Sequence, residues 1–150
     1  MEIHDLHFEI SNSGNVVRLE PLERIMYNSD LDYDKNWIKT SIIIRGGRFS
    51  EQYMAIFLTR DFELLEAGLS KLYDNLKGAT SFHDLEGYLK LDILGDGFGH
   101  FEVTVKACDE PGFYSSELMF RMEFDQTQIK AMTNQLRRIM DQFPVIGHLG

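Results

Sequence analysis

The sequence predicts an α+β domain in which a mainly antiparallel β-sheet of about seven or eight strands carries two amphipathic helices. Period-two alternation of apolar and polar residues recurs along most of the chain, in segments that are rich in β-branched and aromatic residues. Two further segments carry apolar residues at helical spacing. Glycine-containing turns separate the alternating segments, so we expect neighbouring strands to run antiparallel.

Two hairpins are expected in the first part of the chain. Residues 3–10 and 15–20 alternate on either side of an Asn-Ser-Gly-Asn turn, so the second segment can return antiparallel to the first. Residues 37–45 form a β-branched run, which a Gly-Gly pair separates from the alternating residues 49–57. This spacing predicts a tight hairpin.

Two helices are expected, one in each half of the chain. Thr59 is placed to cap the first helix and Gly78 to stop it. The second helix begins near Asp125 and ends before Pro144. Each has a single apolar stripe, which predicts that each packs on a sheet. The stripes are Phe62, Leu65, Leu69, Leu72, Tyr73 and Leu76 in the first helix, and Ile129, Met132, Leu136, Ile139, Met140 and Phe143 in the second. Strands followed by a helix thus occur twice, which fits either an internal repeat or a shared helical period alone.

Length and charge limit the classes of function. A chain of 150 residues fits a single domain spanning 1–150, and 43% apolar residues exclude a disordered acidic tail. Its 24 acidic and 15 basic residues leave a net charge of −9, which argues against nucleic acid or an anionic membrane as the direct ligand. Residues 1–34 alone hold eight acidic and two basic residues. The charge fits a protein that binds something positive, or serves solubility only.

The cysteine content and the N-terminus indicate a compartment. The single cysteine, Cys108, cannot form an intrachain disulfide. The first residues lack a basic start followed by an apolar stretch, and no apolar run approaches the ~18 residues of a membrane span. We therefore expect a cytoplasmic protein.

The glycine-rich segment at residues 95–100 predicts a hairpin turn rather than a phosphate loop, because alternating residues follow it where a phosphate loop needs a helix. Placing the apolar side chains on one face pairs Ile93 with Phe101. In this register Asp92 lies directly opposite Glu102, with their Cβ atoms roughly 5 Å apart.

Three interpretations of Asp92, Glu102 and the nearby His100 remain open. Lys90 and Lys106 can neutralise the carboxylates on a solvated sheet face. A partner's Lys or Arg can lie between them, since like charges held close are complementary to a positive ligand. A metal or a catalytic carboxylate pair would need a third ligand and a pocket, which the sequence does not indicate.

Three aspartates, Asp30, Asp32 and Asp34, have the opening spacing of a calcium loop. The sixth position is Lys35 rather than Gly and the twelfth is Ser rather than Glu, so we do not expect an EF-hand. Two aromatic residues flank the acids. We expect the aspartates to lie on the surface and Trp37 to begin a strand and lie in the core.

No residue pattern predicts an enzyme. The five histidines are scattered without helical metal spacing, and no Gly-x-Ser-x-Gly or Walker sequence is present. We therefore expect no catalytic residues, no metal and no cofactor.

An ordered set of short motifs over about residues 30–147 resembles a known family. The motifs are Asp32-Tyr33-Asp34-Lys35-Asn36-Trp37-Ile38, then Gly47, Phe49, Tyr53 and Leu58-Thr59, then Phe82, Leu85-Glu86-Gly87 and Leu89, then Gly95-Asp96-Gly97 with Gly99-His100, then Phe124-Asp125-Gln126-Thr127, and finally Phe143-Pro144-Val145-Ile146-Gly147. This set resembles the WapI-like immunity proteins of bacteria, whose members are partners of polymorphic toxins. The resemblance implies a binder rather than an enzyme and supplies neither catalytic residues nor a transferable interface.

Charge and resemblance together suggest one mechanism, in which an acidic surface docks on a basic toxin domain, expected to be a nuclease, and covers its cleft. The expected toxin-binding residues are Glu20, Glu23, Asp30, Asp32 and Asp34, with Asp92 and Glu102 as a second set. The partner is thus a protein, not nucleic acid or a membrane, and the chain is a monomer or a weak dimer. Two alternatives remain: an acidic secretion chaperone for an exported effector, which would be a dimer, and a small-ligand binding domain that uses Asp92, Glu102 and His100.

Overall fold

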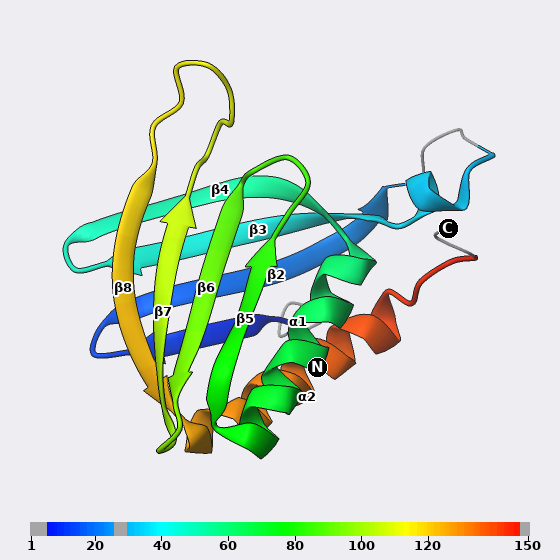
Figure 1. Ribbon diagram of the computed structural model, residues 1–150. Coiled ribbons are helices and arrows are strands. Elements are labelled where there is room, and N and C mark those ends of the chain that lie inside the picture. The colour runs from blue at the N-terminus through cyan, green and yellow to red at the C-terminus, as the bar shows by residue number, and fades with distance from the viewer. Residues whose placement is uncertain (1–5, 26–29, 148–150) are drawn as a thin grey trace.

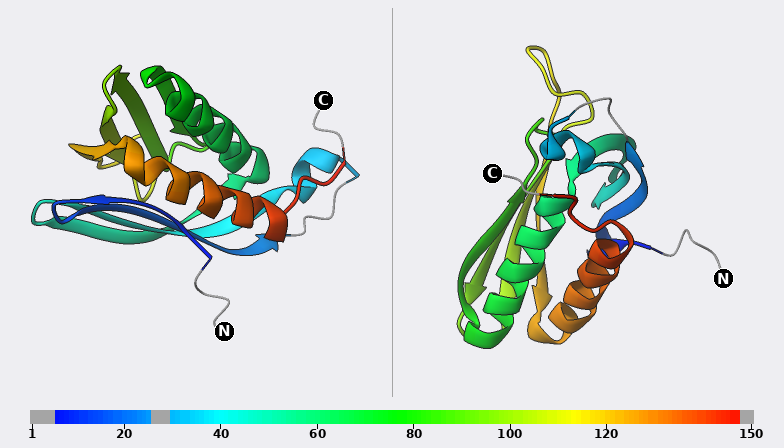
Figure 2. Two further views of the ribbon diagram at one scale, coloured as in Figure 1. Left: turned by 90° about the horizontal axis from the view of Figure 1, so that it is seen from below. Right: turned by 90° about the vertical axis from the view of Figure 1, so that its right-hand side faces the viewer.

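In the computed structural model, which describes residues 6–25 and 30–147, eight strands form two four-stranded antiparallel sheets. The sheets cross over each other face to face, and two helices lie side by side along one side of the pair (Figure 1, Figure 2). The predicted α+β class is confirmed, with the strands divided between two sheets. Each half of the described chain has the same order of elements, four strands followed by a helix.

The first sheet has the strand order β1-β2-β3-β4. Its strands are β1 (Phe8–Asn12), β2 (Asn15–Ile25), β3 (Trp37–Gly46) and β4 (Phe49–Leu58). Both predicted hairpins are present, and residues 3–5 of the first predicted segment lie outside the described residues. Gly46 pairs with Phe49, and the two residues between them close the hairpin with Gly47 at a φ of 62°, which glycine adopts without strain.

The second sheet has the order β5-β6-β7-β8. Its strands are β5 (Lys77–His83), β6 (Leu89–Asp96), β7 (His100–Ala107) and β8 (Leu118–Asp125). Apolar side chains of both sheets meet in the space between the sheets. Because apolar and polar residues alternate along the strands, the polar side chains lie on the opposite faces, toward solvent. The buried residues of both sheets and both helices belong to one hydrophobic cluster.

The predicted register of the β6–β7 hairpin is wrong by two residues. Gly95, not Ile93, pairs with Phe101, so Asp92 lies opposite Thr104. The turn is set by Asp96, whose Oδ1 accepts hydrogen bonds from the N–H groups of Phe98 and His100, at 2.7 and 3.2 Å. A shift of two residues keeps every side chain on its own face, so the apolar pattern does not distinguish the two registers.

Helix α1 (Thr59–Asn75) begins and ends differently from the prediction. Thr59 is its first helical residue rather than its cap, and within the described structure its buried hydroxyl has no hydrogen-bond partner. The Asp61 carboxylate instead accepts a hydrogen bond from the Leu58 N–H at 2.9 Å. At the other end Leu76, with a φ of 63°, reverses the chain directly into β5, so Gly78 lies in the strand.

Helix α2 (Ile129–Gln142) is entered through a short 3-10 turn, η3 (Gln126–Gln128), and ends before Pro144 as predicted. Asp125 caps this turn by accepting a hydrogen bond from the Thr127 N–H at 2.9 Å. The two helices pack on each other, α1 against β5 and α2 against β1. They therefore fill the space that the crossed sheets leave open on this side (Figure 2).

The carboxyl of Asp61 gives the fold a pH dependence of unusual sign. Its burial raises its pKa to about 6 from 3.8, against the effect of the Leu58 N–H. Between these two values the folded chain holds a proton that the unfolded chain has released. The contribution of Asp61 to the free energy of unfolding therefore falls as the pH rises through this window, by at most about 3 kcal/mol.

We expect Asp61→Asn to remove this dependence, because the amide oxygen can still accept the Leu58 N–H but does not titrate. In urea unfolding, the stability of the variant relative to the parent chain should rise by about 1–2 kcal/mol between about pH 4.5 and pH 7.5. Subtracting the free energy of unfolding of the parent from that of the variant removes the contributions of the other carboxylates, which titrate in both chains. A difference that is independent of pH would contradict the assignment.

Candidate protein-interaction surfaces

The first predicted set of acids gathers around the end of β2 and the segment that follows it. Because β2 bulges between Pro21 and Glu23, Glu20 and Glu23 face Ser41 and Lys39 and so lie on the same outer face of the sheet. Asp30 is exposed, and Asp32 and Asp34 belong to a 3-10 turn, η2 (Asp32–Lys35), at the same end of the sheet (Figure 1). We call these five acids the acidic end.

Several carboxylates of the acidic end have partners within the chain. Glu20 lies 3.4 Å from Arg18, and Asp32 lies 3.2 Å from Lys35. Asp34 accepts a hydrogen bond from the Trp37 indole at 3.4 Å. The prediction that Trp37 lies in the core is wrong: its side chain is half-buried on the outer face of the sheet. The neighbouring Ile38 takes the core position. Glu23 and Asp30 are the more exposed members of the set.

The buried Asn36 attaches the acidic end to the C-terminal segment. Its Nδ2 donates to the backbone carbonyls of Asp32 (2.6 Å) and Ile146 (3.0 Å), and its Oδ1 accepts the Ile146 N–H at 2.7 Å. Arg24 adds hydrogen bonds to the carbonyls of Lys35 and Pro144. Residues 110 apart in sequence are thus joined, and η2 is presented on a fixed support.

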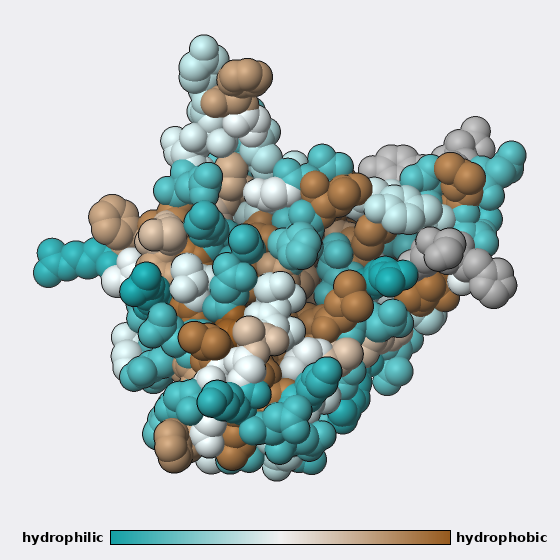
Figure 3. Space-filling model, viewed as in Figure 1, coloured by the Kyte–Doolittle hydropathy of each residue, from teal (hydrophilic) through white to brown (hydrophobic). Residues whose placement is uncertain are grey.

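The second predicted set lies on the outer face of the other sheet, apart from the acidic end. Asp92 and Glu102 are diagonal neighbours, not opposite each other as predicted, and both line a shallow hollow of about 430 Å³. Lys90 lies 3.8 Å from Asp92, and Arg121, rather than Lys106, lies 3.9 Å from Glu102. Each carboxylate thus has a nearby base on this mixed face (Figure 3).

His100 does not join this pair. Its Nδ1 lies 3.2 Å from the Asp96 carboxylate in the β6–β7 turn. Among residues 6–25 and 30–147, no group of three His, Cys, Asp or Glu side chains is placed to hold a metal ion.

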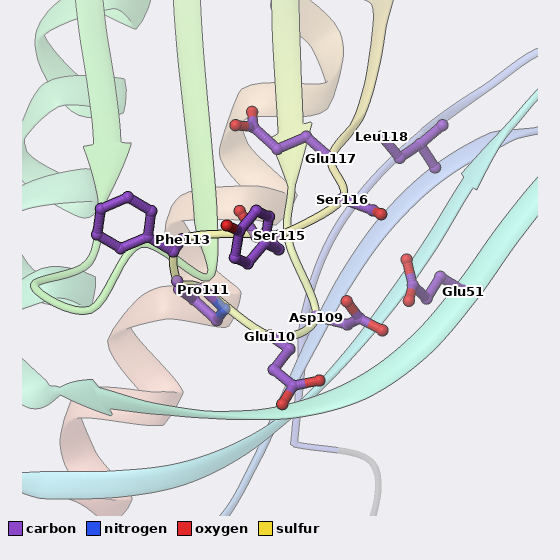
Figure 4. Close-up of a pocket in the computed structure, with 11 residues that line it drawn as sticks. Glu51, Asp109, Glu110, Pro111, Phe113, Ser115, Ser116, Glu117 and Leu118 are labelled. Atoms are coloured by element: carbon purple, nitrogen blue, oxygen red, sulfur yellow. The ribbon is translucent and has the colours of Figure 1, made fainter.

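The loop between β7 and β8 is a feature that the sequence predictions missed. It projects from one end of the second sheet (Figure 1, Figure 3) and, together with Glu51 of β4, encloses a hollow of about 600 Å³. Four carboxylates line this hollow: Glu51, Asp109, Glu110 and Glu117 (Figure 4). Of the described residues that line it, none is basic.

Two aromatic residues occupy the projecting part of this loop. Phe113 and Tyr114 are each 100% exposed, and their ring centroids are 6.2 Å apart. The signal in the sequence is an adjacent aromatic pair between Pro-Gly and Ser-Ser, within an acidic segment that has no apolar periodicity. Such a pair has no core position to occupy, so its exposure could have been predicted from the sequence.

The comparisons with known proteins decide the family. A family model for the immunity protein WapI-like family matches residues 7–144. The chain belongs to this family. The match confirms the resemblance seen in the motifs and extends it to β1 and β2, which lie before residue 30. Among curated protein sequences, none matches this immunity-family chain.

Solved structures are similar to this immunity-family protein in fold alone. The plant transcriptional regulator PBF-2 aligns with a TM-score of 0.52 at 13% identity, covering 91% of this chain and 81% of that one. WHY1 from Arabidopsis thaliana aligns with a TM-score of 0.52 at 11% identity, covering 93% and 84%. The Trypanosoma MRP1/MRP2 structure aligns with a TM-score of 0.50 at 10% identity, covering 92% and 86%.

The family's description is that of immunity proteins, which implies a toxin protein as the partner of this chain. Within the described part of the chain, no helix has the length and apolar character that crossing a membrane requires.

Proposed function

We propose that this chain is an immunity protein that binds a cognate toxin domain with a basic surface, expected to be a nuclease, and neutralises it in the cytoplasm. The observation that carries the proposal is the family match over residues 7–144, and the net charge of −9 supports a positively charged partner. Neutralisation by binding requires surface complementarity but no catalytic group, so we propose no enzymatic activity. A monomer or weak dimer suffices for a one-to-one complex.

The mechanism follows from the chemistry of nuclease clefts. A protein that binds RNA or DNA phosphates presents Lys and Arg side chains in its cleft. Carboxylates on an immunity protein can occupy the positions of the substrate phosphates beside these Lys and Arg side chains and so exclude the substrate. Their electrostatic field also accelerates the encounter of the two proteins at low ionic strength. We propose the acidic end as one part of this contact, with Asp92 and Glu102 as a second part.

The test begins with capture and continues with rescue. The tagged chain is used to isolate partners from its own host's lysate at low and high salt, and a captured domain is then expressed in a laboratory bacterium with and without this chain. We expect the domain alone to stop growth, the pair to restore it, and the two purified proteins to form a folded complex. Capture of an unfolded exported effector by a dimer would favour the chaperone alternative instead.

Charge reversal at the acidic end should slow association with the toxin. Changing Glu20, Glu23 and Asp30 to Lys moves the net charge from −9 to −3, since each change adds two charges. We expect the association rate to fall several-fold at about 50 mM salt and much less at about 500 mM, because exposed charges act on the encounter and salt screens them.

The control for this variant carries the same charge change elsewhere. Glu63, Asp74 and Asp141 are exposed residues of the two helices, and changing all three to Lys also gives a net charge of −3. Stopped-flow association is measured for both variants. Equal slowing would show that only the net charge matters, and no slowing of the first variant at low salt would remove the acidic end from the contact.

A further inference from the structure

The β7–β8 loop carries an exposed aromatic pair that the fold does not require. It spans residues 108–117, and its Phe113 and Tyr114 side chains are completely exposed. Large aromatic side chains in a monomer normally bury most of their surface, and aromatic residues are enriched among those that dominate the energy of protein interfaces. A pair of them at the projecting part of a loop is therefore a candidate anchor for a partner.

The base of the loop is held by hydrogen bonds. The Cys108 N–H donates to the Tyr88 carbonyl at 3.0 Å, and the Tyr53 hydroxyl donates to the same carbonyl at 2.6 Å. Tyr88 itself belongs to a turn closed by the buried Asp84, whose carboxylate accepts three backbone N–H groups, those of Gly87, Tyr88 and Leu89. The loop thus rises from a fixed support, which lowers the entropy that is lost when its tip is bound.

The charges beside the aromatic pair indicate the chemistry of the partner. The Glu51 and Asp109 carboxylates lie next to each other and point toward each other on one side of the hollow (Figure 4). Burial, together with the hydrogen bond and the repulsion from Asp109, raises the pKa of Glu51. Crowded carboxylates with no base among their described neighbours in the hollow are complementary to a cationic side chain.

We propose that this loop is the anchor by which the chain docks on its toxin: Phe113 and Tyr114 enter an apolar recess of the toxin domain, and a Lys or Arg beside that recess enters the hollow and binds the adjacent Glu51 and Asp109 carboxylates. The inference rests on the proposed function and adds the contact surface and the chemistry of its occupant. A second copy of this chain is the less suitable occupant, because it would bring the same carboxylates toward one another.

The test uses the full chain and the toxin domain obtained by capture and rescue. In the variant Phe113→Ser/Tyr114→Ser, both removed rings are fully exposed, so we expect an unchanged melting temperature and circular dichroism spectrum. We expect affinity for the toxin to fall by about 30-fold or more, mainly through faster dissociation, and growth rescue to weaken. Asp109→Asn should weaken binding in the same direction.

The matched control removes exposed apolar side chains outside the proposed contacts. Phe98 of the β6–β7 turn and Leu64 of α1 are 85% and 54% exposed, and the variant Phe98→Ser/Leu64→Ser should bind the toxin as the parent does. Parent-like binding by the Phe113/Tyr114 variant would overturn this inference while leaving the immunity function in place. A parent chain that binds no folded toxin would overturn both, and a parent dimer that only the loop variant disrupts would assign the loop to self-association instead.

Discussion

Phe57→Ala is expected to lower the free energy of unfolding by about 3–5 kcal/mol, because it leaves a cavity where the two sheets and α1 meet. The Phe57 ring is fully buried and contacts Phe62 of α1 and Phe82 of β5, with ring centroids 6.0 and 5.2 Å apart. A typical domain has only about 5–15 kcal/mol of stability in total, so this change alone should bring the chain close to unfolding.

The control for Phe57→Ala is Phe49→Ala, which removes the same ring from the other end of the same strand. Phe49 is 70% exposed, so we expect its loss to change stability by less than about 0.5 kcal/mol. Urea unfolding is followed by circular dichroism for both variants. Similar midpoints for the two would mean that the aromatic cluster does not join the sheets and the helix as described.

Asn36→Ala is expected to cost about 2–4 kcal/mol and to loosen the acidic end. The side chain is 0% exposed, and its loss leaves the Ile146 N–H and the carbonyls of Asp32 and Ile146 without their partner. The cost therefore comes from partly buried polar groups that lose their partner rather than from a cavity. We further expect the substitution to increase the hydrogen-exchange rates of the η2 and Ile146 amides more than those of amides elsewhere in the chain.

Two comparisons make this prediction specific. Asn36→Asp retains an acceptor for the Ile146 N–H but places a carboxylate against two carbonyls, so it should also destabilise the chain. Asn134→Ala changes an exposed asparagine of α2 and should be close to neutral. If Asn36→Ala proved as mild as Asn134→Ala, the attachment of η2 to the C-terminal segment would not stabilise the fold.

Much of the architecture could be predicted from local patterns. The alternation in β3 and β4 and the Gly-Gly pair between them predicted that hairpin correctly, since face and turn are both properties of a few consecutive residues. The apolar stripe of α2 and Pro144 predicted that helix for the same reason. The end of α1 was missed, because Leu76 adopts a left-handed conformation that its residue type does not suggest.

The candidate surfaces were predicted less completely. Composition pointed to Glu23 and Asp30 as exposed acids, and both are exposed. It did not reveal that Glu51 of β4 and Asp109 of the β7–β8 loop share one hollow, since they are far apart in the sequence. The prediction that Asp92 lies directly opposite Glu102 was wrong, because Asp96, which accepts backbone N–H groups in the turn, sets the register of β6 and β7.

Local sequence is enough to predict the element types, the buried faces, the acidic character and the family of this chain, because each of these is carried by residue identity and by spacing over a few residues. Three features appear only in the folded chain: the division of the strands between two crossed sheets, the attachment of η2 to the C-terminal segment by Asn36, and the acidic hollow beside an exposed aromatic pair. These features depend on contacts between residues distant in the chain, and such contacts form only when the core brings them together.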